Sequence, residues 1–126
     1  MTRPLRLPQR NKYRRVKESP EADRESCTYK GQLYHSRLEA RYAATLDQLA
    51  NASDPKERVV AWDRQVKFDL RVNGKHITNY FCDFRVYLAD GRIEYREVKG
   101  FETEVWKLKK ALLEATMPDI ALKMVR

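Results

Sequence analysis

The chain has 126 residues, of which 42% are hydrophobic and 35% are charged, and its formal net charge is +8. This length suits one domain with a small core, and this composition excludes a wholly disordered chain. Because no apolar run approaches membrane-spanning length and no apolar stretch follows the charged N-terminus, we expect no membrane partner, no signal peptide and a cytoplasmic protein.

Residues 1–17 carry a strongly one-sided charge, with seven Lys or Arg and no acidic residue, whereas the rest of the chain has 19 basic and 18 acidic residues. Such a segment is either a solubilising tail or an arm that neutralises the phosphates of a nucleic acid, and the near-neutral remainder favours the arm. We expect residues 1–28 to form a flexible basic arm and residues 29–126 to form the folded domain. The arm residues expected to contact nucleic acid are Arg10, Lys12, Arg14, Arg15 and Lys17.

A first helix is expected from Ser36 to about Asn51, after an extended piece over residues 28–34. Its apolar side chains recur on one helical stripe: Leu38, Tyr42, Leu46 and Leu49. Ser36 and Glu39 have the spacing of a capping box, which is by itself a complete structural explanation for Glu39. His35 precedes the cap and is most simply a loop histidine, although it could contact a phosphate.

A strand is expected over residues 65–72, after an extended stretch that begins at Val59. Asn73-Gly74 follows and is the strongest hairpin signal in the chain, typical of a type I′ turn. The hairpin leads into a strand rich in aromatic and β-branched residues, Tyr80–Leu88. These segments predict an antiparallel meander.

The next strand, Ile93–Lys99, follows after Ala89-Asp90-Gly91, and the length of this loop decides which side chains face each other. A two-residue loop would place Asp83 opposite Val98, whereas a three-residue loop places Asp83 opposite Glu97. Gly91 suits the left-handed position that the three-residue loop requires. We therefore predict the three-residue loop, with Asp83 and Glu97 on one face.

A second helix is expected from Thr103 to about Ala115, ended by Pro118 and followed by a last strand over residues 120–125. The side chains expected to face inward are Val105, Leu108, Leu112 and Ala115. Lys107 and Lys110 share a helix face, which is either solvated or lines a path for DNA. Strand, helix and strand predict a right-handed crossover with a parallel last pair, hence an α/β protein with a mixed sheet.

Asp83, Glu97 and Lys99 form the most informative constellation of the sequence. Glu97 and Lys99 alternate on an extended strand and point the same way. Two carboxylates can hold a hard divalent cation, and a neighbouring lysine can steer a phosphate or a water. The competing interpretation is a solvated cross-strand ion pair, which is common on hairpins. The sequence contains no motif of a histidine-based nuclease, a Walker-type phosphate loop or a nucleophile elbow.

Five short motifs occur in order along the chain, followed by the lysine-bearing helix: Lys12-Tyr13, Tyr34-His35-Ser36-Arg37-Leu38-Glu39-Ala40-Arg41-Tyr42, Trp62-Asp63-Arg64-Gln65-Val66-Lys67-Phe68, Tyr80-Phe81-Cys82-Asp83-Phe84 and Glu97-Val98-Lys99-Gly100. As an ordered set they resemble the PD-(D/E)XK nuclease superfamily, specifically its small phage-type, Holliday-junction-resolvase-like endonucleases. The resemblance covers nearly all of residues 12–125. Cys82 stands where the superfamily's name has a proline, which is often missing in its members.

The resemblance implies a restriction-endonuclease-like core, with a mixed sheet flanked by helices, and Mg²⁺-dependent hydrolysis of DNA in which Mn²⁺ can substitute. It implies that Asp83, Glu97 and the carbonyl of Val98 are metal ligands. It also implies that Glu39 is a further carboxylate on or near the metal, that Lys99 positions or deprotonates the attacking water, and that Gln65 orients the water or the phosphate.

Two questions remain open at this point. Glu39 is either a ligand or a helix cap, and the two roles compete because a side chain that reaches its cap cannot also face the sheet; the resemblance favours the ligand. The protein is a nuclease, a non-catalytic nucleic-acid-binding module, or an interaction protein that binds RNA through the same basic arm. The intact Asp83, Glu97 and Lys99 favour the nuclease over the non-catalytic module. A plausible DNA substrate is a branched recombination intermediate, and cutting it would call for a homodimer with two sites. If the protein is phage-encoded, we expect it in the cytoplasm of the host cell.

Overall fold

The structure is a computed structural model that describes residues 20–126. Its elements in chain order are α2 (Pro20–Ser26), β1 (Thr28–Tyr29), β2 (Gln32–Leu33), α3 (Arg37–Gln48), the 3₁₀ turn η2 (Leu49–Asn51), β3 (Val59–Val72), β4 (Lys75–Leu88), β5 (Ile93–Val98), α4 (Glu104–Thr116) and β6 (Leu122–Val125). None of the helices in residues 20–126 has the length and apolarity to cross a membrane.

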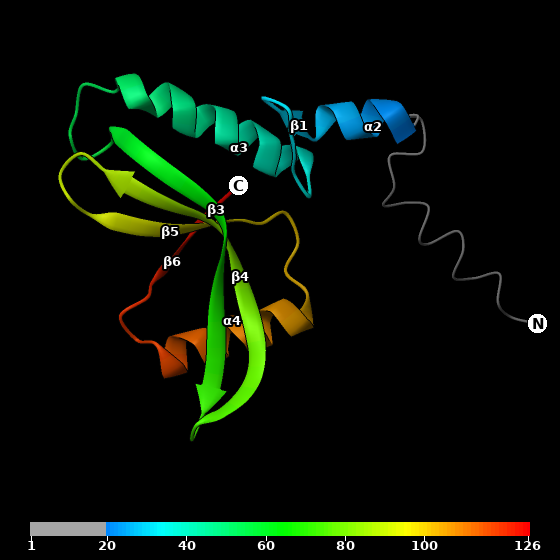
Figure 1. The fold of residues 1–126 in the computed structure, drawn as a ribbon, viewed down its shortest axis with the longest axis vertical. Helices are drawn as coiled ribbons and strands as arrows, with labels where there is room; N and C mark the ends of the chain where they lie inside the picture. The colour runs from blue at the N-terminus through cyan, green and yellow to red at the C-terminus, as the bar shows by residue number, and fades with distance from the viewer. Residues whose placement is uncertain (1–19) are drawn as a thin grey trace, which may run out of the picture.

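The main sheet has the strand order β3-β4-β5-β6. Its first three strands are antiparallel neighbours, and β6 pairs parallel to β5. Figure 1 shows α3 along the upper part of the sheet and α4 beside the lower half of the long β3–β4 hairpin. The chain is therefore an α/β protein with a mixed sheet, as the sequence predicts.

Both hairpin predictions are confirmed. Asn73 and Gly74 have φ values of 52° and 80°, as a type I′ turn requires, and Val72 pairs with Lys75. In the second hairpin the Leu88 N–H donates to the Arg92 carbonyl, and Gly91 has a φ of 96°. The β4–β5 ladder ends at Phe84 and Arg96, so Asp83 and Glu97 are the next residues to face each other.

The first helix begins where the capping pattern predicts. Ser36 is the N-cap of α3, and its Oγ accepts the Glu39 N–H at 3.1 Å. The α-helix ends at Gln48, and the last turn is the 3₁₀ turn η2, so only its final three residues differ from the expected helix. The extended piece expected over residues 28–34 is a small hairpin of β1 and β2 instead.

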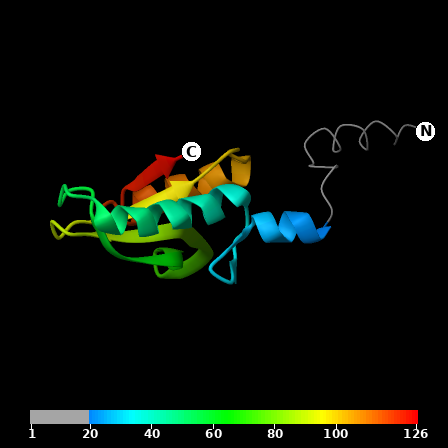
Figure 2. The ribbon, with the colours of Figure 1, turned by 90° about the horizontal axis from the view of Figure 1, so that it is seen from above.

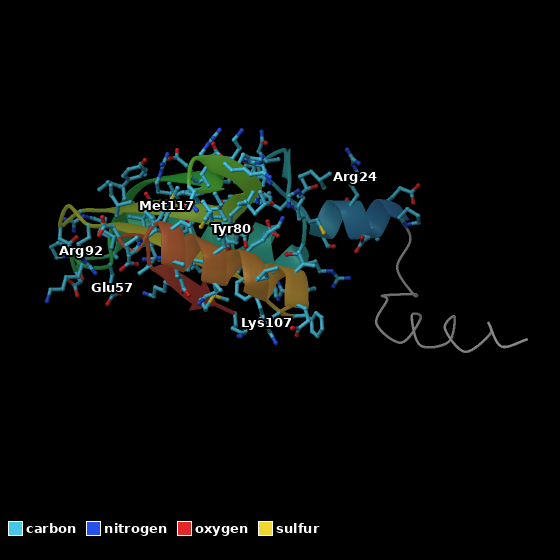
Figure 3. The ribbon with its side chains drawn as sticks, turned by 90° about the horizontal axis from the view of Figure 1, so that it is seen from below. Arg24, Glu57, Tyr80, Arg92, Lys107 and Met117 are labelled. Carbon is cyan, nitrogen blue, oxygen red and sulfur yellow. The ribbon has the colours of Figure 1, made fainter. Side chains whose placement is uncertain are left out.

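The sequence missed the helix α2. It lies at residues 20–26, inside the range expected to lack regular structure. None of its residues is buried, so the apolar periodicity that reveals a packed helix is absent. Figure 2 shows α2 extending away from the body, and Figure 3 shows Arg24 pointing away from the rest of the chain. The boundary expected at residue 28 thus falls after a helix rather than inside a flexible segment.

The inward face predicted for the second helix is largely wrong: of its four side chains only Leu112 packs against the core, and Val105, Leu108 and Ala115 are exposed. Val105 and Leu108 are 64% and 70% exposed, whereas Trp106 and Leu113 are buried. Trp106 and Leu113 are seven residues apart and therefore share one helix face. Because an indole buries more apolar area than a valine or leucine side chain, α4 turns Trp106 toward the sheet.

The buried core falls into two clusters. One lies around α3 and contains Phe84 and Val86 of β4, and the other lies around α4 and contains Tyr80 and Cys82 of the same strand. The boundary between the two core clusters therefore crosses β4 at Asp83. Directly across the sheet, Gln65 of β3 has a left-handed backbone with a φ of 52°, which interrupts the regular pleat of the strand. The sheet changes its packing partner at the position where the acidic side chains lie.

Candidate functional site

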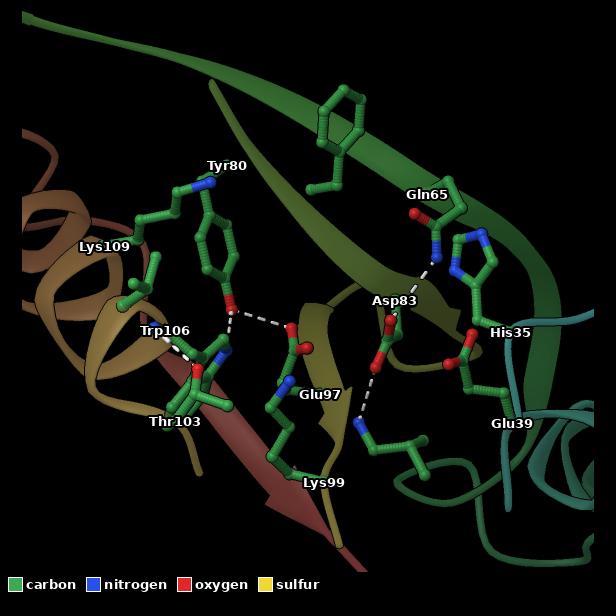
Figure 4. Close-up of a pocket in the computed structure, with 13 residues that line it drawn as sticks. His35, Glu39, Gln65, Tyr80, Asp83, Glu97, Lys99, Thr103, Trp106 and Lys109 are labelled. Carbon is green, nitrogen blue, oxygen red and sulfur yellow. Dashed lines mark hydrogen bonds between the residues drawn. The ribbon is translucent and has the colours of Figure 1, made fainter. Parts of the chain in front are cut away.

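A pocket of about 430 Å³ lies where the end of β5 approaches α3, α4 and the kink in β3 (Figure 4). Seven of the residues predicted for the site line it, coming from five separate parts of the chain. They are His35, Glu39, Gln65, Asp83, Glu97, Val98 and Lys99. The fold therefore brings together the side chains that the resemblance groups by function.

Asp83 lies at the centre of the pocket and is 8% exposed. Its Oδ2 accepts the backbone N–H of Val98 at 3.0 Å, and its Oδ1 accepts a hydrogen bond from Gln65 Nε2 at 3.3 Å. The ladder between β4 and β5 stops just before Asp83, so the carboxylate takes the place of a strand partner for Val98. Asp83 thus fixes the end of β5 as well as the geometry of the pocket.

Gln65 reaches Asp83 from a strained backbone. A left-handed conformation costs a non-glycine residue on the order of 1–3 kcal/mol, and such residues cluster at functional sites. Gln65 lies between the paired residues Arg64 and Val66 and faces Asp83 across the sheet. The resemblance assigns Gln65 to the water or the phosphate, and in the structure Gln65 directly contacts the candidate ligand Asp83.

Glu97 is 3% exposed, and its Oε1 accepts a hydrogen bond from the Tyr80 hydroxyl at 2.8 Å. Burial and the neighbouring charge of Asp83 raise the pKa of Glu97 to about 8. Burial and Asp83 also raise the pKa of Glu39, which is 7% exposed. The carboxylates in this pocket therefore oppose one another's ionisation, as negative groups held close together do.

Glu39 lines the pocket and lies beside its cap without the reach-back bond to the Ser36 N–H that would compete with a place in the pocket. The Ser36 hydroxyl lies 3.4 Å from Glu39 Oε2. Among the hydrogen bonds of residues 20–126, none joins the Glu39 side chain to the Ser36 N–H, so the capping box is only half formed. The Glu39 carboxylate lies toward Asp83 (Figure 4), because the first turn of α3 faces the kinked part of the sheet.

Lys107 and Lys110 share one face of α4, as the sequence predicts, and that face lies outside the pocket. Lys107 and Lys110 pair with Glu104 and Glu114 at 3.4 and 2.7 Å, and they line a separate depression. Figure 3 shows Lys107 at the outer side of α4. Lys109 lines the pocket instead. The sequence missed Lys109 because the inward face of the helix was assigned to the wrong residues.

Cys82 occupies the position before Asp83 and is fully buried. Burial and the charge of Glu97 raise the pKa of its thiol to about 12, so the thiolate needed for nucleophilic chemistry does not form near neutral pH. The thiol donates weak hydrogen bonds to the backbone carbonyls of Phe84 and Arg96. Cys82 is a structural residue behind the site.

The donor set fits a hard divalent cation. Among the described residues, no three acidic, histidine or cysteine side chains converge as a complete metal cage. Mg²⁺ does not require one, because it keeps several waters and takes one or two carboxylates. Asp83 and Glu97 can supply those carboxylates with the Val98 carbonyl beside them, and Glu39 adds a further negative charge. A cation would also relieve the repulsion that raises the pKa of Glu97 and Glu39.

This electrostatic arrangement predicts a pH-dependent stability. The pKa of Glu97 rises from 4.5 to about 8 on folding, so the folded state binds more protons between these values and loses stability as the pH increases. One pKa unit corresponds to about 1.4 kcal/mol, and we expect the metal-free protein to lose about 2 kcal/mol or more between pH 5 and pH 8. Denaturant melts at both pH values measure the loss.

Two controls make this prediction specific. Glu97→Gln removes the titrating group and should flatten the pH dependence. Adding Mn²⁺ should stabilise the wild type more at pH 8 than at pH 5, because only the ionised carboxylates bind the cation. A wild type whose stability is constant or increases over this range would contradict the electrostatic description of the pocket.

Comparison with known families gives a match over most of the chain. The model of a family described as protein of unknown function, DUF1064, matches residues 21–126. No curated protein and no solved structure matches the chain.

Proposed function

The chain belongs to the DUF1064 family, and we propose that it is a divalent-metal-dependent endodeoxyribonuclease, which hydrolyses phosphodiester bonds in DNA with a restriction-endonuclease-like core. The observation that carries the proposal is the pocket in which Asp83, Glu97 and Glu39 meet Lys99. These residues come from distant parts of the chain, and their resemblance to the PD-(D/E)XK nucleases rests on the same positions.

The proposed ligands are Asp83, Glu97 and the carbonyl of Val98, with Glu39 on or near the metal. A bound Mg²⁺ or Mn²⁺ supplies a water of lowered pKa and neutralises charge on the phosphate. Hydrogen bonds from Val98 and Gln65 hold Asp83, and a hydrogen bond from Tyr80 holds Glu97, so both carboxylates are oriented before substrate arrives.

Lys99 is the proposed group that acts on the reacting atoms. The water oxygen forms a bond to phosphorus and loses a proton to solvent, and the bond from phosphorus to the leaving sugar oxygen breaks. Solvent returns a proton to that leaving oxygen, so the products are a phosphomonoester and an alcohol. A lysine ammonium can hydrogen-bond the water before attack and stabilise the charge that builds on the phosphate oxygens. Lys99 lines the pocket with Glu97, two residues earlier in the chain, and this shared position supports both proposed tasks.

Basic side chains at the pocket are needed to attract the DNA phosphates to a site that is otherwise acidic. Three carboxylates repel a phosphodiester, and Lys99 and Lys109 provide positive charge in the same pocket. His35 is a further candidate for a phosphate contact, and it lies beside Glu39 and Gln65 (Figure 4). The arrangement of acidic centre and basic surroundings supports DNA as the partner.

The proposal is tested by incubating the full chain with supercoiled, linear and four-way-junction DNA in Mg²⁺, Mn²⁺ or EDTA. We expect metal-dependent cleavage that Glu97→Ala abolishes while DNA binding is retained, because the variant removes a ligand and no phosphate contact. Binding without cleavage in every metal would favour the non-catalytic nucleic-acid-binding module. Preference for the four-way junction would support branched DNA as the substrate and would call for a test of homodimer formation by analytical ultracentrifugation.

Deleting residues 1–17 should weaken DNA binding and reduce its dependence on salt. The segment lies outside the described residues, so this prediction rests on its seven basic side chains, which include Arg10, Lys12, Arg14, Arg15 and Lys17. Each phosphate contact changes the slope of log K against log salt by about 0.9, and loss of all seven would reduce its magnitude by about 6. Fluorescence anisotropy at several salt concentrations measures the slope, and an unchanged slope would show that the segment does not contact DNA.

A further inference from the structure

A chain of buried hydrogen bonds joins α4 to the candidate ligand Glu97. Trp106 Nε1 donates to the Tyr80 hydroxyl at 3.1 Å, and the Tyr80 hydroxyl donates to Glu97 Oε1 at 2.8 Å. The three residues are 8%, 2% and 3% exposed. In Figure 4, Tyr80 and Trp106 lie on one side of Glu97, and Asp83 lies on the other.

The chemistry of the three side chains determines which group donates and which accepts in each of these hydrogen bonds. An indole N–H can only donate, so the Tyr80 oxygen must accept from Trp106. The single hydroxyl hydrogen of Tyr80 is then directed to Glu97, whose Oε1 must accept it. One carboxylate oxygen, Oε1, is thereby engaged in a fixed position.

Trp106 also contacts the candidate catalytic lysine. Lys99 Nζ lies 5.1 Å from the centroid of the Trp106 ring, within the range of a cation–π interaction. A lysine ammonium sits on a flexible four-carbon stem, and an aromatic face beside it limits the positions that it occupies. The same tryptophan therefore reaches Glu97 through Tyr80 and reaches Lys99 directly.

We infer that Tyr80 and Trp106 are positioning residues that hold the Glu97 carboxylate and the Lys99 ammonium in the geometry of the proposed reaction. This inference rests on the proposed function, because positioning has meaning only if Glu97 binds a cation. It goes beyond that function, since neither the sequence motifs nor the resemblance gave a role to Tyr80 or Trp106.

Core packing explains the rings but not their polar atoms. Tyr80 and Trp106 belong to the buried cluster around α4, with Leu70 and Leu113. A phenylalanine would fill the space of Tyr80 without placing a hydroxyl in the interior, where a polar group must find a partner. Here the partner is a buried carboxylate that lines the pocket, as is typical of the residues that orient metal ligands from behind.

The test is the affinity of the metal-free full chain for Mn²⁺, measured by isothermal titration calorimetry without DNA. Tyr80→Phe keeps the ring and removes the hydroxyl, and loss of an outer-sphere partner typically weakens metal binding about 10–100-fold. We therefore expect a Kd about 10-fold higher or more, and cleavage that recovers toward the wild-type rate when Mn²⁺ is raised. A purely structural role would lower the melting temperature without this recovery.

Tyr29→Phe is the matched control. The Tyr29 hydroxyl also donates to a carboxylate, Asp47 at 2.6 Å, but neither residue lines the pocket. Its loss should leave Mn²⁺ affinity unchanged. Trp106→Phe is a second variant, which removes the N–H that orients Tyr80 and keeps an aromatic ring, and it should weaken Mn²⁺ binding less than Tyr80→Phe does. Wild-type affinity in folded Tyr80→Phe, or in folded Trp106→Phe if the first variant does not fold, would overturn the inference.

Glu97→Gln separates this inference from the proposed function. If Glu97→Gln loses Mn²⁺ binding and Tyr80→Phe does not, the metal centre stands and the positioning role is wrong. If the wild type binds no Mn²⁺, or if Glu97→Gln binds it as the wild type does, the proposed function fails and the positioning role fails with it.

Discussion

Replacing Asp83 by asparagine is expected to lower the rate of DNA cleavage by about 1000-fold or more. A metal ion contributes several kcal/mol of stabilisation to the transition state, and about 4 kcal/mol corresponds to a change in rate of about 1000-fold. Asparagine has nearly the same shape as aspartate, so the fold should persist while the charge that holds the cation is lost. Single-turnover cleavage in saturating Mg²⁺ measures the effect.

The hydrogen bonds of Asp83 show why this variant should fold. The asparagine that replaces it keeps one oxygen to accept the Val98 N–H, and Gln65 can rotate its amide to present its own oxygen to the new amide group. Asp63→Asn is the matched control, because Asp63 also lies on the sheet but pairs with Arg85 at 2.8 Å, outside the pocket. Cleavage by Asp83→Asn at the rate of Asp63→Asn would exclude Asp83 as a ligand.

Replacing Lys99 by methionine should lower the cleavage rate about 100- to 1000-fold and leave Mn²⁺ affinity close to that of the wild type. Methionine has a similar length and keeps the contact with the Trp106 ring, but it has no charge and donates no hydrogen bond. The loss of one oriented donor to a developing negative charge has this size in other enzymes. The rate is measured at saturating DNA and metal, so that the effect appears in kcat.

A second lysine variant controls for the general loss of positive charge. Lys107→Met removes a charge from α4, but Lys107 pairs with Glu104 and lies away from the pocket. It should change DNA binding slightly and kcat not at all. If Lys99→Met changes only the apparent affinity for DNA, as a phosphate contact would, then Lys99 has no part in the chemical step.

The sequence predicts the parts of this site that local rules control. Loop length and the left-handed Gly91 determine the β4–β5 register, and the register alone places Asp83 opposite Glu97. The Asn73-Gly74 turn and the Ser36 cap are predicted for the same reason, since each depends on a few neighbouring residues. The position of Glu39 in the pocket came from the resemblance, because spacing alone favoured a helix cap.

The parts that the sequence does not predict depend on tertiary packing. The positive φ of Gln65 follows no residue preference, since glutamine seldom adopts it, and it occurs across the sheet from Asp83, where the two core clusters meet. The inward face of α4 is decided by the fit of Trp106 against Tyr80, which lies 26 residues away in the chain. Because that face was misassigned, the sequence prediction missed Lys109 and the contact of Trp106 with Tyr80.

The central claim is that this chain hydrolyses DNA with a divalent cation held by Asp83 and Glu97. Its most direct test is the conversion of supercoiled plasmid to nicked and linear forms by the wild type and Asp83→Asn, purified identically and assayed in Mg²⁺ and in EDTA. We predict conversion by the wild type in Mg²⁺ alone, with none by the variant. Equal conversion by both proteins, or conversion in EDTA, would contradict the claim.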